Sequence, residues 1–376
     1  MDTKIKQELV DIFYAGVNAV SGFQATHNAL ISESHFTPDF IIAVGKAASG
    51  MCAGALTAMA DPCPALLITK YQHTDQMMLD HPTVTVIESA HPVPDKNSLL
   101  AGQAMLNAVS DLSAGSQLLL LVSGGTSALS ELLPAEMSLA EWQNLTQKML
   151  ACGFNIGQIN AQRKKTSLIK DGKLLKNFTG EQLLVLAISD VEGDDISVIG
   201  SGTGDPKHVT SNKTLKLIGT NQVARQACAT TAQDLGYQVQ VNIENLYQDI
   251  HRAAVEIAQH LTSGPKGLYI FGGEPTVNLP KNPGSGGRNQ SLALALALHI
   301  RGLENIYILV AGTDGSDGPT DAAGGIVDGR TVQDIAAAKT ALKEADAGSC
   351  LRQTEHIFIT GPTNTNVMDL VIAVKL

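Results

Sequence analysis

The chain has 376 residues, of which 44% are hydrophobic and only 4% aromatic, and its formal net charge is −10. A chain of this length suggests two or three domains and can bury a large core. The negative charge argues against a nucleic-acid partner, because nucleic-acid-binding proteins present a basic patch. An acidic protein can still bind phosphates through a local group of Lys, Arg and backbone N–H groups.

The 5 cysteines are scattered and include no CxxC pair. This pattern is typical of reduced thiols in a cytoplasm rather than of a disulfide framework or a zinc site. The first twenty residues or so lack the apolar segment of a signal peptide. No stretch reaches the roughly 18 apolar residues that a membrane-spanning helix needs. We therefore expect a cytoplasmic protein that does not bind membranes.

Short apolar runs alternate with helical patterns along most of the chain, which predicts mainly parallel sheets covered by helices. The expected strands are 40–44, 65–69, 84–88, 117–122, 183–188, 215–218, 238–243, 267–271, 305–310 and 356–360. The expected helices are 95–110, 138–152, 221–235 and 290–300, the last being apolar on all sides and hence buried. Ser138 and Glu141 are spaced as a capping box at the start of the second of these helices. These elements predict an α/β fold with two strand–helix arrays, 1–235 and 236–376, that meet in a cleft.

Several loops that directly follow apolar runs carry the residues of chemical interest. The segment 311–329 holds six glycines and, besides Asp328, the carboxylates Asp314, Asp317 and Asp321 after the expected strand 305–310. Ligands of α/β sheets bind at the carboxyl ends of strands, and one or two carboxylates beside substrate phosphates suit Mg²⁺. A tight turn with solvated charges is the alternative.

Lys46 follows the first strand and Gly45, at the start of an expected helix. Free N–H groups and a lysine make an anion site there, although the spacing is not that of a P-loop. His91 lies in a loop with two prolines, Pro92 and Pro94, and Asp95 is the expected N-cap of the next helix. We therefore interpret His91 as a loop residue rather than an acid or base.

The small residues Ser123, Gly124 and Gly125 follow the apolar run 117–122 and could form a backbone nest for an anion. A serine nucleophile is not expected, because the GxSxG pattern is absent. Arg163 and Lys164 belong to a basic cluster, which is either a solvated helix face or a phosphate-neutralising group.

Asp190 directly follows another buried strand, where a carboxylate can bind a metal or accept a hydroxyl proton. Gly287, Arg288 and Asn289 open the apolar helix, so a guanidinium and N–H donors could point at an anion. The segment 360–366 could belong to the same site or act as a rigid turn. Glycine-rich loops, cations and strand-end aspartates together are the parts that phosphoryl transfer needs. No GxGxxG fingerprint of a dinucleotide-binding oxidoreductase is present.

The motifs GKAASGM, SAHPVPD, VSGGTSAL, SDVEGDD, GGEPTV, GSGGRNQ, GTDGSDGPTDAAG and TGPTNTN occur in this order between about residues 40 and 370. In this set the chain resembles the class II glycerate kinases, the family with a MOFRL C-terminal domain. The resemblance implies two three-layer α/β/α domains, a Rossmann-like N-terminal domain and a smaller MOFRL-type domain. It also implies a small-molecule substrate, with transfer of the γ-phosphate of ATP to the 2-hydroxyl of D-glycerate in the presence of Mg²⁺.

The resemblance places the catalytic residues at Lys46, Asp190, Arg288 and Asp314, with Asp190 or Asp314 as metal ligand or base. Ser123, Gly124, Gly125, Arg163, Lys164, Gly287, Asn289 and Asp317 are expected to bind substrate or phosphate.

Several positions depart from the family pattern, among them Thr203, Gly204, Asn364 and Met368. Another small hydroxy acid is therefore an alternative acceptor. A hydroxypyruvate reductase is an alternative activity, since relatives of the family carry that label. The sequence leaves the oligomeric state open, a homodimer being one option.

Overall fold

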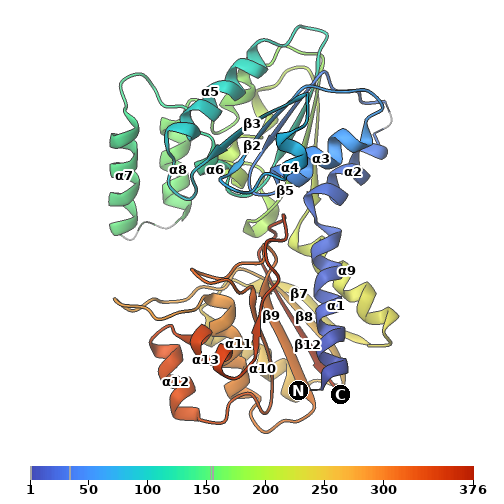
Figure 1. Ribbon diagram of the computed structural model, residues 1–376, viewed down its shortest axis with the longest axis vertical. Helices are drawn as coiled ribbons and strands as arrows, with labels where there is room; N and C mark the ends of the chain where they lie inside the picture. Colours follow the sequence, from blue (N-terminus) through green and yellow to red (C-terminus); the bar gives the residue numbers. More distant parts are fainter. Residues whose placement is uncertain (1, 34, 153, 155) are drawn as a thin grey trace. The chain divides into compact units, whose positions relative to one another are not determined.

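The computed structural model describes residues 2–33, 35–152, 154 and 156–376. The chain forms two compact units. One, here called the parallel-sheet unit, comprises residues 20–220 and 364–366. The other, the mixed-sheet unit, comprises residues 1–19, 221–363 and 367–376. Figure 1 labels the helices and strands of both units.

These units differ from the expected division at residue 235. Helices α1 (Thr3–Ala19) and α9 (Asn221–Asp234) pack against each other within the mixed-sheet unit. A Cβ on Gly16 would lie 2.5 Å from Sγ of Cys228, so the two helices approach closely. The periodicity of a helix does not report which distant helix it will contact, and the sequence therefore assigned both helices to the other unit.

The parallel-sheet unit contains a 6-stranded sheet in the order β3-β2-β1-β4-β5-β6. The strands are β1 (Phe40–Val44), β2 (Ala65–Lys70), β3 (Val84–Ser89), β4 (Gln117–Val122), β5 (Gln182–Ile188) and β6 (Asn212–Gly219). All neighbouring pairs are parallel, as the sequence predicts. The run LLLLV in β4 is buried along its whole length, because helices cover both faces of such a sheet.

The helices of this unit are α2 (Gly22–Ile31), α3 (Ala48–Ala58), α4 (Gln76–Leu79), α5 (Lys96–Ser110), α6 (Thr126–Leu129), α7 (Leu139–Ala151) and α8 (Ile156–Thr166). Short 3₁₀ turns follow at Lys173–Asn177, Glu192–Asp194, Ile199–Gly202 and Pro206–His208. Two expected caps are confirmed. Asp95 accepts from N–H of Ser98 before α5, and Ser138 and Glu141 exchange hydrogen bonds before α7.

The mixed-sheet unit contains a second 6-stranded sheet in the order β11-β10-β9-β12-β8-β7. Its strands are β7 (Val239–Leu246), β8 (Gly267–Gly273), β9 (Ile306–Gly312), β10 (Gly324–Asp328), β11 (Ile357–Phe358) and β12 (Asp369–Lys375). β12 runs antiparallel to β8 and β9, and β10 antiparallel to β9. The expectation of a mainly parallel sheet is wrong here. Strand direction depends on the path of the connecting loops, which the apolar runs do not encode.

Strand β10 lies inside the segment 311–329, which the sequence presents as one loop. The sequence does not predict this strand, because it begins with Gly324 and Gly325 and glycine is disfavoured in strands. A Cβ on Gly324 would lie 1.9 Å from the carbonyl oxygen of Val310 on β9. The close approach of the two backbones therefore requires glycine at this position.

The remaining helices of this unit are α10 (Ile250–Ser263), α11 (Arg288–His299), α12 (Ile335–Lys343) and α13 (Ala347–Gln353). α11 is buried from Asn289 to Ala297, as its apolar circumference predicts, and it packs against α10, β9 and β10. α1 and α9 pack against strands β12, β8 and β7. Figure 1 shows these two groups of helices on opposite faces of the mixed sheet.

Across the described residues, no helix is long and apolar enough to cross a bilayer. All five cysteines are free thiols, which agrees with the absence of a disulfide framework in the sequence.

Candidate functional site

The parallel sheet reverses its direction of growth between β1 and β4, since β2 and β3 lie on one side and β5 and β6 on the other. In open α/β sheets, ligands bind outside the carboxyl ends of the strands at this switch point. The loops that leave β1, β4 and β5 carry Lys46, the segment Ser123–Gly125 and Asp190. The sheet order thus brings three of the expected loops to one edge.

Hydrogen bonds join the first two loops directly. The N–H of Lys46 donates to the carbonyl of Gly124 at 2.8 Å, and the N–H of Ala47 donates to Oγ of Ser123 at 3.1 Å. Gly45 has φ +127°, and a Cβ there would lie 2.1 Å from Oγ of Ser123. Glycine is therefore required before Lys46, and Ser123 is a buried spacer between the loops rather than an exposed nucleophile.

Asp190 lies against the second loop. A Cβ on Gly124 would be 1.9 Å from Oδ2 of Asp190, so only glycine lets this carboxylate approach the loop. Nδ2 of Asn366 donates to the same oxygen at 3.3 Å. Asn366 belongs to the parallel-sheet unit although it lies near the C-terminus of the chain. The motif TGPTNTN therefore supplies a polar side chain to this site.

Gly125 lies between the side chains of Lys46 and His91. A Cβ on Gly125 would lie 3.1 Å from Cγ of Lys46 and 3.3 Å from Cδ2 of His91. Burial and, after it, the positive charges of Lys46, Lys70 and Arg163 together lower the pKa of His91 to about 4. His91 is therefore neutral at physiological pH, in a group of side chains that is positively charged within an acidic protein.

A buried ionic cluster supports helix α6, which follows the glycine loop. The ammonium of Lys170 donates to the carbonyls of Thr126 and Ser130 at 3.3 and 2.5 Å. Glu131 is buried beside it and accepts a hydrogen bond from Ser167. Burial lowers the pKa of Lys170 to about 8, although the carboxylate of Glu131 opposes the shift. No local pattern indicates this cluster, because its members are separated along the chain.

The two residues of the expected basic cluster have different surroundings. Arg163 is buried at 9% exposure and donates from Nη1 to Oδ1 of Asn160 at 3.3 Å. Its charge acts on His91. Lys164 is half-buried, and its backbone carbonyl accepts a hydrogen bond from Nζ of Lys173. Of this pair, Arg163 contributes to the positive group around His91.

In the mixed-sheet unit, Arg288 is already paired with carboxylates. Its Nε donates to Oδ2 of Asp369 at 2.5 Å, and its Nη1 lies 2.8 Å from Oε1 of Glu274. Burial by itself would lower the pKa of Arg288, but the charges of these two carboxylates raise it. Asp369 is 1% exposed and Glu274 47%. An anionic ligand could take over the Glu274 contact far more easily than the Asp369 contact.

Asp317 occupies the N-terminus of α11. Its carboxylate accepts from the N–H groups of Asn289 and Gln290 at 3.0 and 2.8 Å, and from Nε2 of Gln290 at 2.9 Å. A Cβ on Gly287 would lie 2.3 Å from Cγ of Asp317. The helix N-terminus that the sequence offers to a ligand anion therefore holds an anion of the protein itself, while burial raises the pKa of Asp317 to about 6.

Asp314 and Asn289 complete the expected residues of this unit. Oδ1 of Asp314 accepts from N–H and Oγ of Ser316, each at 2.9 Å, which forms an Asx turn. Nδ2 of Asn289 donates to Oδ1 of Asp369 at 2.9 Å, and the residue is fully buried. Both side chains therefore have local structural contacts, and Asp314 is the more exposed of the two.

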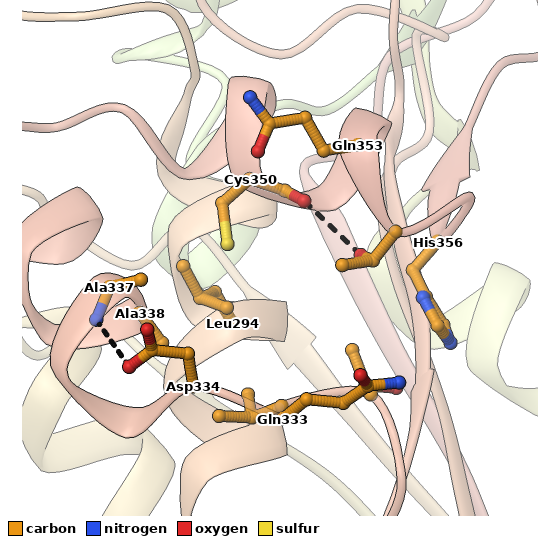
Figure 2. Close-up of a pocket in the computed structure, with 11 residues that line it drawn as sticks. Leu294, Gln333, Asp334, Ala337, Ala338, Cys350, Gln353 and His356 are labelled. Atoms are coloured by element: carbon orange, nitrogen blue, oxygen red, sulfur yellow. Dashed lines mark hydrogen bonds between the residues drawn. The ribbon is translucent and has the colours of Figure 1, made fainter.

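A separate pocket of about 370 Å³ lies in the mixed-sheet unit, and none of the expected site residues lines it. Figure 2 shows the thiol of Cys350 directed toward Leu294, and Asp334 bonded to N–H of Ala337 at the start of α12. Burial raises the pKa of the Cys350 thiol and lowers that of the His356 imidazole, so both groups are neutral. With Asp334 as the charged group of its lining, this pocket is unsuited to a phosphate.

The structure thus brings Lys46, Ser123, Gly124, Gly125 and Asp190 together in the parallel-sheet unit, with Arg163 nearby. It brings Gly287, Arg288, Asn289 and Asp317 together in the mixed-sheet unit. His91, Asn366, Glu274 and Asp369 are contacts that the sequence did not single out for the site. Their positions depend on tertiary packing. No group of three or more metal-ligating side chains occurs among the described residues.

Parallel strands with a glycine loop, a lysine and an aspartate at the switch point define an α/β protein with polar groups where such folds bind ligands. The family model described as a domain of unknown function (DUF4147) matches residues 8–235, and the MOFRL family model matches residues 267–369. A D-glycerate 2-kinase of Thermotoga maritima is 33% identical over 98% of this chain and 98% of its own length. The chain belongs to the MOFRL-type glycerate 2-kinase family.

Two further similarities bear on this assignment. The crystal structure of a glycerate kinase from Thermotoga maritima matches with a TM-score of 0.89 and 31% identity, covering 99% of this chain and 100% of that chain. A protein of Agrobacterium vitis, provisionally named a hydroxypyruvate reductase, is 30% identical over 88% of this chain and 97% of its own length. The family resemblance of the sequence and its α/β fold are confirmed.

Proposed function

We propose that this protein is a glycerate 2-kinase, which transfers the γ-phosphate of ATP to the 2-hydroxyl of D-glycerate and yields 2-phosphoglycerate and ADP. The observation that carries this proposal is the meeting of Lys46, the Ser123–Gly125 loop and Asp190 at the switch point of the parallel sheet. Phosphoryl transfer depends mostly on positioning and charge stabilisation, and these residues can supply both. The similarity to named glycerate kinases over nearly the whole chain supports the substrate.

In this proposal each residue has a defined role. The Lys46 ammonium stabilises negative charge on the substrates, and Gly124 lets the carboxylate of Asp190 lie close to the same loop. The glycerate hydroxyl attacks the γ-phosphorus, its proton passes to a carboxylate, and the bond from that phosphorus to the bridging oxygen of ADP breaks. Asp190 is our first candidate for the acceptor of the proton, because its Oδ2 is held beside Gly124 by Asn366.

Magnesium fits the donor chemistry of this site. Asp190 offers a hard carboxylate oxygen at a strand end, and Mg²⁺ is commonly held by one or two carboxylates together with waters and phosphates. Asp190 or Asp314 would hold it, and bound Mg²⁺ would neutralise charge on the transferred phosphate. The base and the metal ligand are therefore alternatives for Asp190, which a pH profile of an Asp190→Asn variant at several Mg²⁺ concentrations would separate.

For the mixed-sheet unit we propose that Arg288 binds a negatively charged group of a substrate by exchanging Glu274 for it, while Asp369 keeps the guanidinium in place. We assign Asp317, Gly287 and Asn289 to the support of this arginine through helix α11. Cytoplasmic location and a homodimer stay predictions from the sequence.

The test is a coupled assay of ADP release with ATP, Mg²⁺ and D-glycerate, with ³¹P NMR to establish that the product is the 2-phosphate. A panel of other small hydroxy acids tests the alternative acceptor. A parallel assay follows NAD(P)H oxidation with hydroxypyruvate and without ATP. ADP release that never exceeds the ATP-only blank, with every acid, would disprove the kinase. NAD(P)H turnover would establish the reductase instead.

A further inference from the structure

His91 is held beside the glycine loop by anchors on both sides. It follows β3, and Oγ of Ser89 at the end of that strand donates to the carbonyl of Leu129 in α6 at 2.7 Å. On the other side, Asp95 caps helix α5. The edge of the His91 ring, Cδ2 and Nε2, would lie 3.3 and 3.5 Å from a Cβ on Gly125. The edge of the imidazole therefore lies against Gly125, close enough for Nε2 to contact an atom placed over this glycine.

The two ring nitrogens of His91 make no hydrogen bond to the described residues of the protein. Among the described residues, no protein atom accepts from or donates to either ring nitrogen of His91, whereas His73 and His81 each bond through Nδ1. Neither nitrogen of His91 is among the fully buried polar atoms that lack a hydrogen-bond partner, so both are open to solvent and a ligand can reach them. A ligand in the space above Gly125 would supply that partner.

The charges around the ring indicate the kind of ligand. The positively charged groups that act on His91 are Lys46, Lys70 and Arg163. A neutral imidazole among cations offers one N–H donor without adding charge. An oxyanion would be attracted by the cations and could accept this hydrogen bond.

We propose that His91 is a specificity-determining residue, whose Nε2–H donates a hydrogen bond to a substrate oxyanion held over Gly125 beside Lys46. This inference rests on the proposed kinase function. The oxyanion is a carboxylate or a phosphate oxygen, so it comes from the acceptor acid or from ATP. We expect the acceptor carboxylate, because Lys46 is the cation that lies against Gly125, and its one positive charge matches the one negative charge of a carboxylate.

The test uses three substitutions of His91 and one control. His91→Phe keeps the ring volume and removes both nitrogens. His91→Gln places an amide N–H near the position of Nε2, and His91→Asn places one near Nδ1. His81→Phe is the matched control, because His81 lies on an exposed loop of the same unit and bonds to Thr83. Thermal unfolding of each variant establishes that it is folded.

With His91→Phe we expect the KM for D-glycerate to rise about ten- to a hundredfold, the range for loss of a hydrogen bond to a charged group. The KM for ATP should stay within about twofold, and His91→Gln should restore more of the affinity than His91→Asn. A rise confined to the KM for ATP would assign the oxyanion to a phosphate. If both KM values match those of the control in a folded His91→Phe variant, the inference is overturned.

A binding measurement separates this inference from the proposed function. Calorimetric titration of the wild-type protein and His91→Phe with D-glycerate, and then with inorganic phosphate, requires no turnover. A wild-type protein that binds either anion more tightly than His91→Phe, yet phosphorylates no acid, would refute the kinase and support the role of His91. A wild-type kinase whose anion affinities are unaffected by His91→Phe would do the reverse.

Discussion

The two units carry similar motifs, but the charged side chains of these motifs are paired differently in each unit. In the mixed-sheet unit the charged residues of the motifs satisfy one another, since Asp317 fills the N-terminus of α11 and Asp369 holds Arg288. In the parallel-sheet unit, cations gather around a neutral His91 that makes no hydrogen bond to any described residue. The same residue types thus pair with one another in one unit and surround a neutral histidine in the other, and only their neighbours distinguish the two.

This contrast predicts that substitutions at the surface of the parallel-sheet unit will lower activity and leave stability unchanged. The largest effect is expected for Lys46→Ala, with a loss of about a hundred- to a thousandfold in kcat/KM, the size typical of removing a charge-stabilising donor. The coupled ADP assay measures it. Lys96→Ala, on the exposed first residue of α5, is the control. A Lys46→Ala variant that is as active as this control would contradict the predicted role of the parallel-sheet unit in activity.

Beneath that surface, the buried Lys170 should matter for stability. Lys170→Met removes the donor to the carbonyls of Thr126 and Ser130 and leaves Arg163 as the cation that acts on the buried Glu131. We expect a loss of about 3 kcal/mol in the free energy of unfolding, because removing one member of a buried group of paired charges is costly. Urea unfolding at neutral pH measures it. An unchanged midpoint would show that the cluster does not support α6.

The same lysine predicts a pH dependence of known sign. Burial puts the pKa of Lys170 at about 8 in the folded protein, below its ordinary value of 10.5. Between these values the unfolded chain binds the additional proton, so the contribution of this group to stability rises from pH 8 to pH 10.5. The difference in unfolding free energy between the wild type and Lys170→Met should therefore grow over this window. A constant difference would contradict the assigned shift.

In the mixed-sheet unit we expect substitutions of the motif carboxylates to lower the free energy of unfolding. Asp369→Asn keeps the shape of the side chain but removes the buried charge that pairs with Arg288. The expected cost is about 2 kcal/mol, at the low end for a broken ion pair because Glu274 remains as a partner. Differential scanning calorimetry measures it. Glu274→Gln, on the exposed side of Arg288, is the control and should lower the unfolding free energy far less.

A smaller effect is expected at the helix cap. Asp317→Ala removes the acceptor for the N–H groups of Asn289 and Gln290, and loss of an N-cap costs about 1 kcal/mol. Asp321→Ala, an exposed aspartate of the same loop that pairs with Arg352, is the matched control. Equal unfolding midpoints for the two variants would mean that Asp317 is not the anchor of α11.

The smallest effect concerns a departure from the family pattern. Asn364 has φ +57° and is exposed, and glycine, the usual residue there, also adopts this left-handed conformation readily. Asn364→Gly should change the unfolding free energy by less than about 1 kcal/mol and leave the KM for D-glycerate unchanged. A marked change in that KM would indicate that Asn364 contacts the substrate and is not only a turn residue.

Local patterns predicted most elements of this fold. The apolar runs located β1 and β4, the caps at Asp95 and Ser138 located the helices that follow them, and the composition of α11 indicated its burial. Each of these features depends on residues within a few positions of one another. Such features are readable from a single sequence because the interactions that produce them are local.

The sequence by itself also determined which residues follow the strand ends, and hence that Lys46, Gly124 and Asp190 were candidates for one site. Only the tertiary structure decided that β1, β4 and β5 are neighbours, that β12 is antiparallel, and that Asp317 serves α11. Strand order and the pairing of distant charges depend on how loops close and which faces pack. These are properties of the whole chain, and no short segment encodes them.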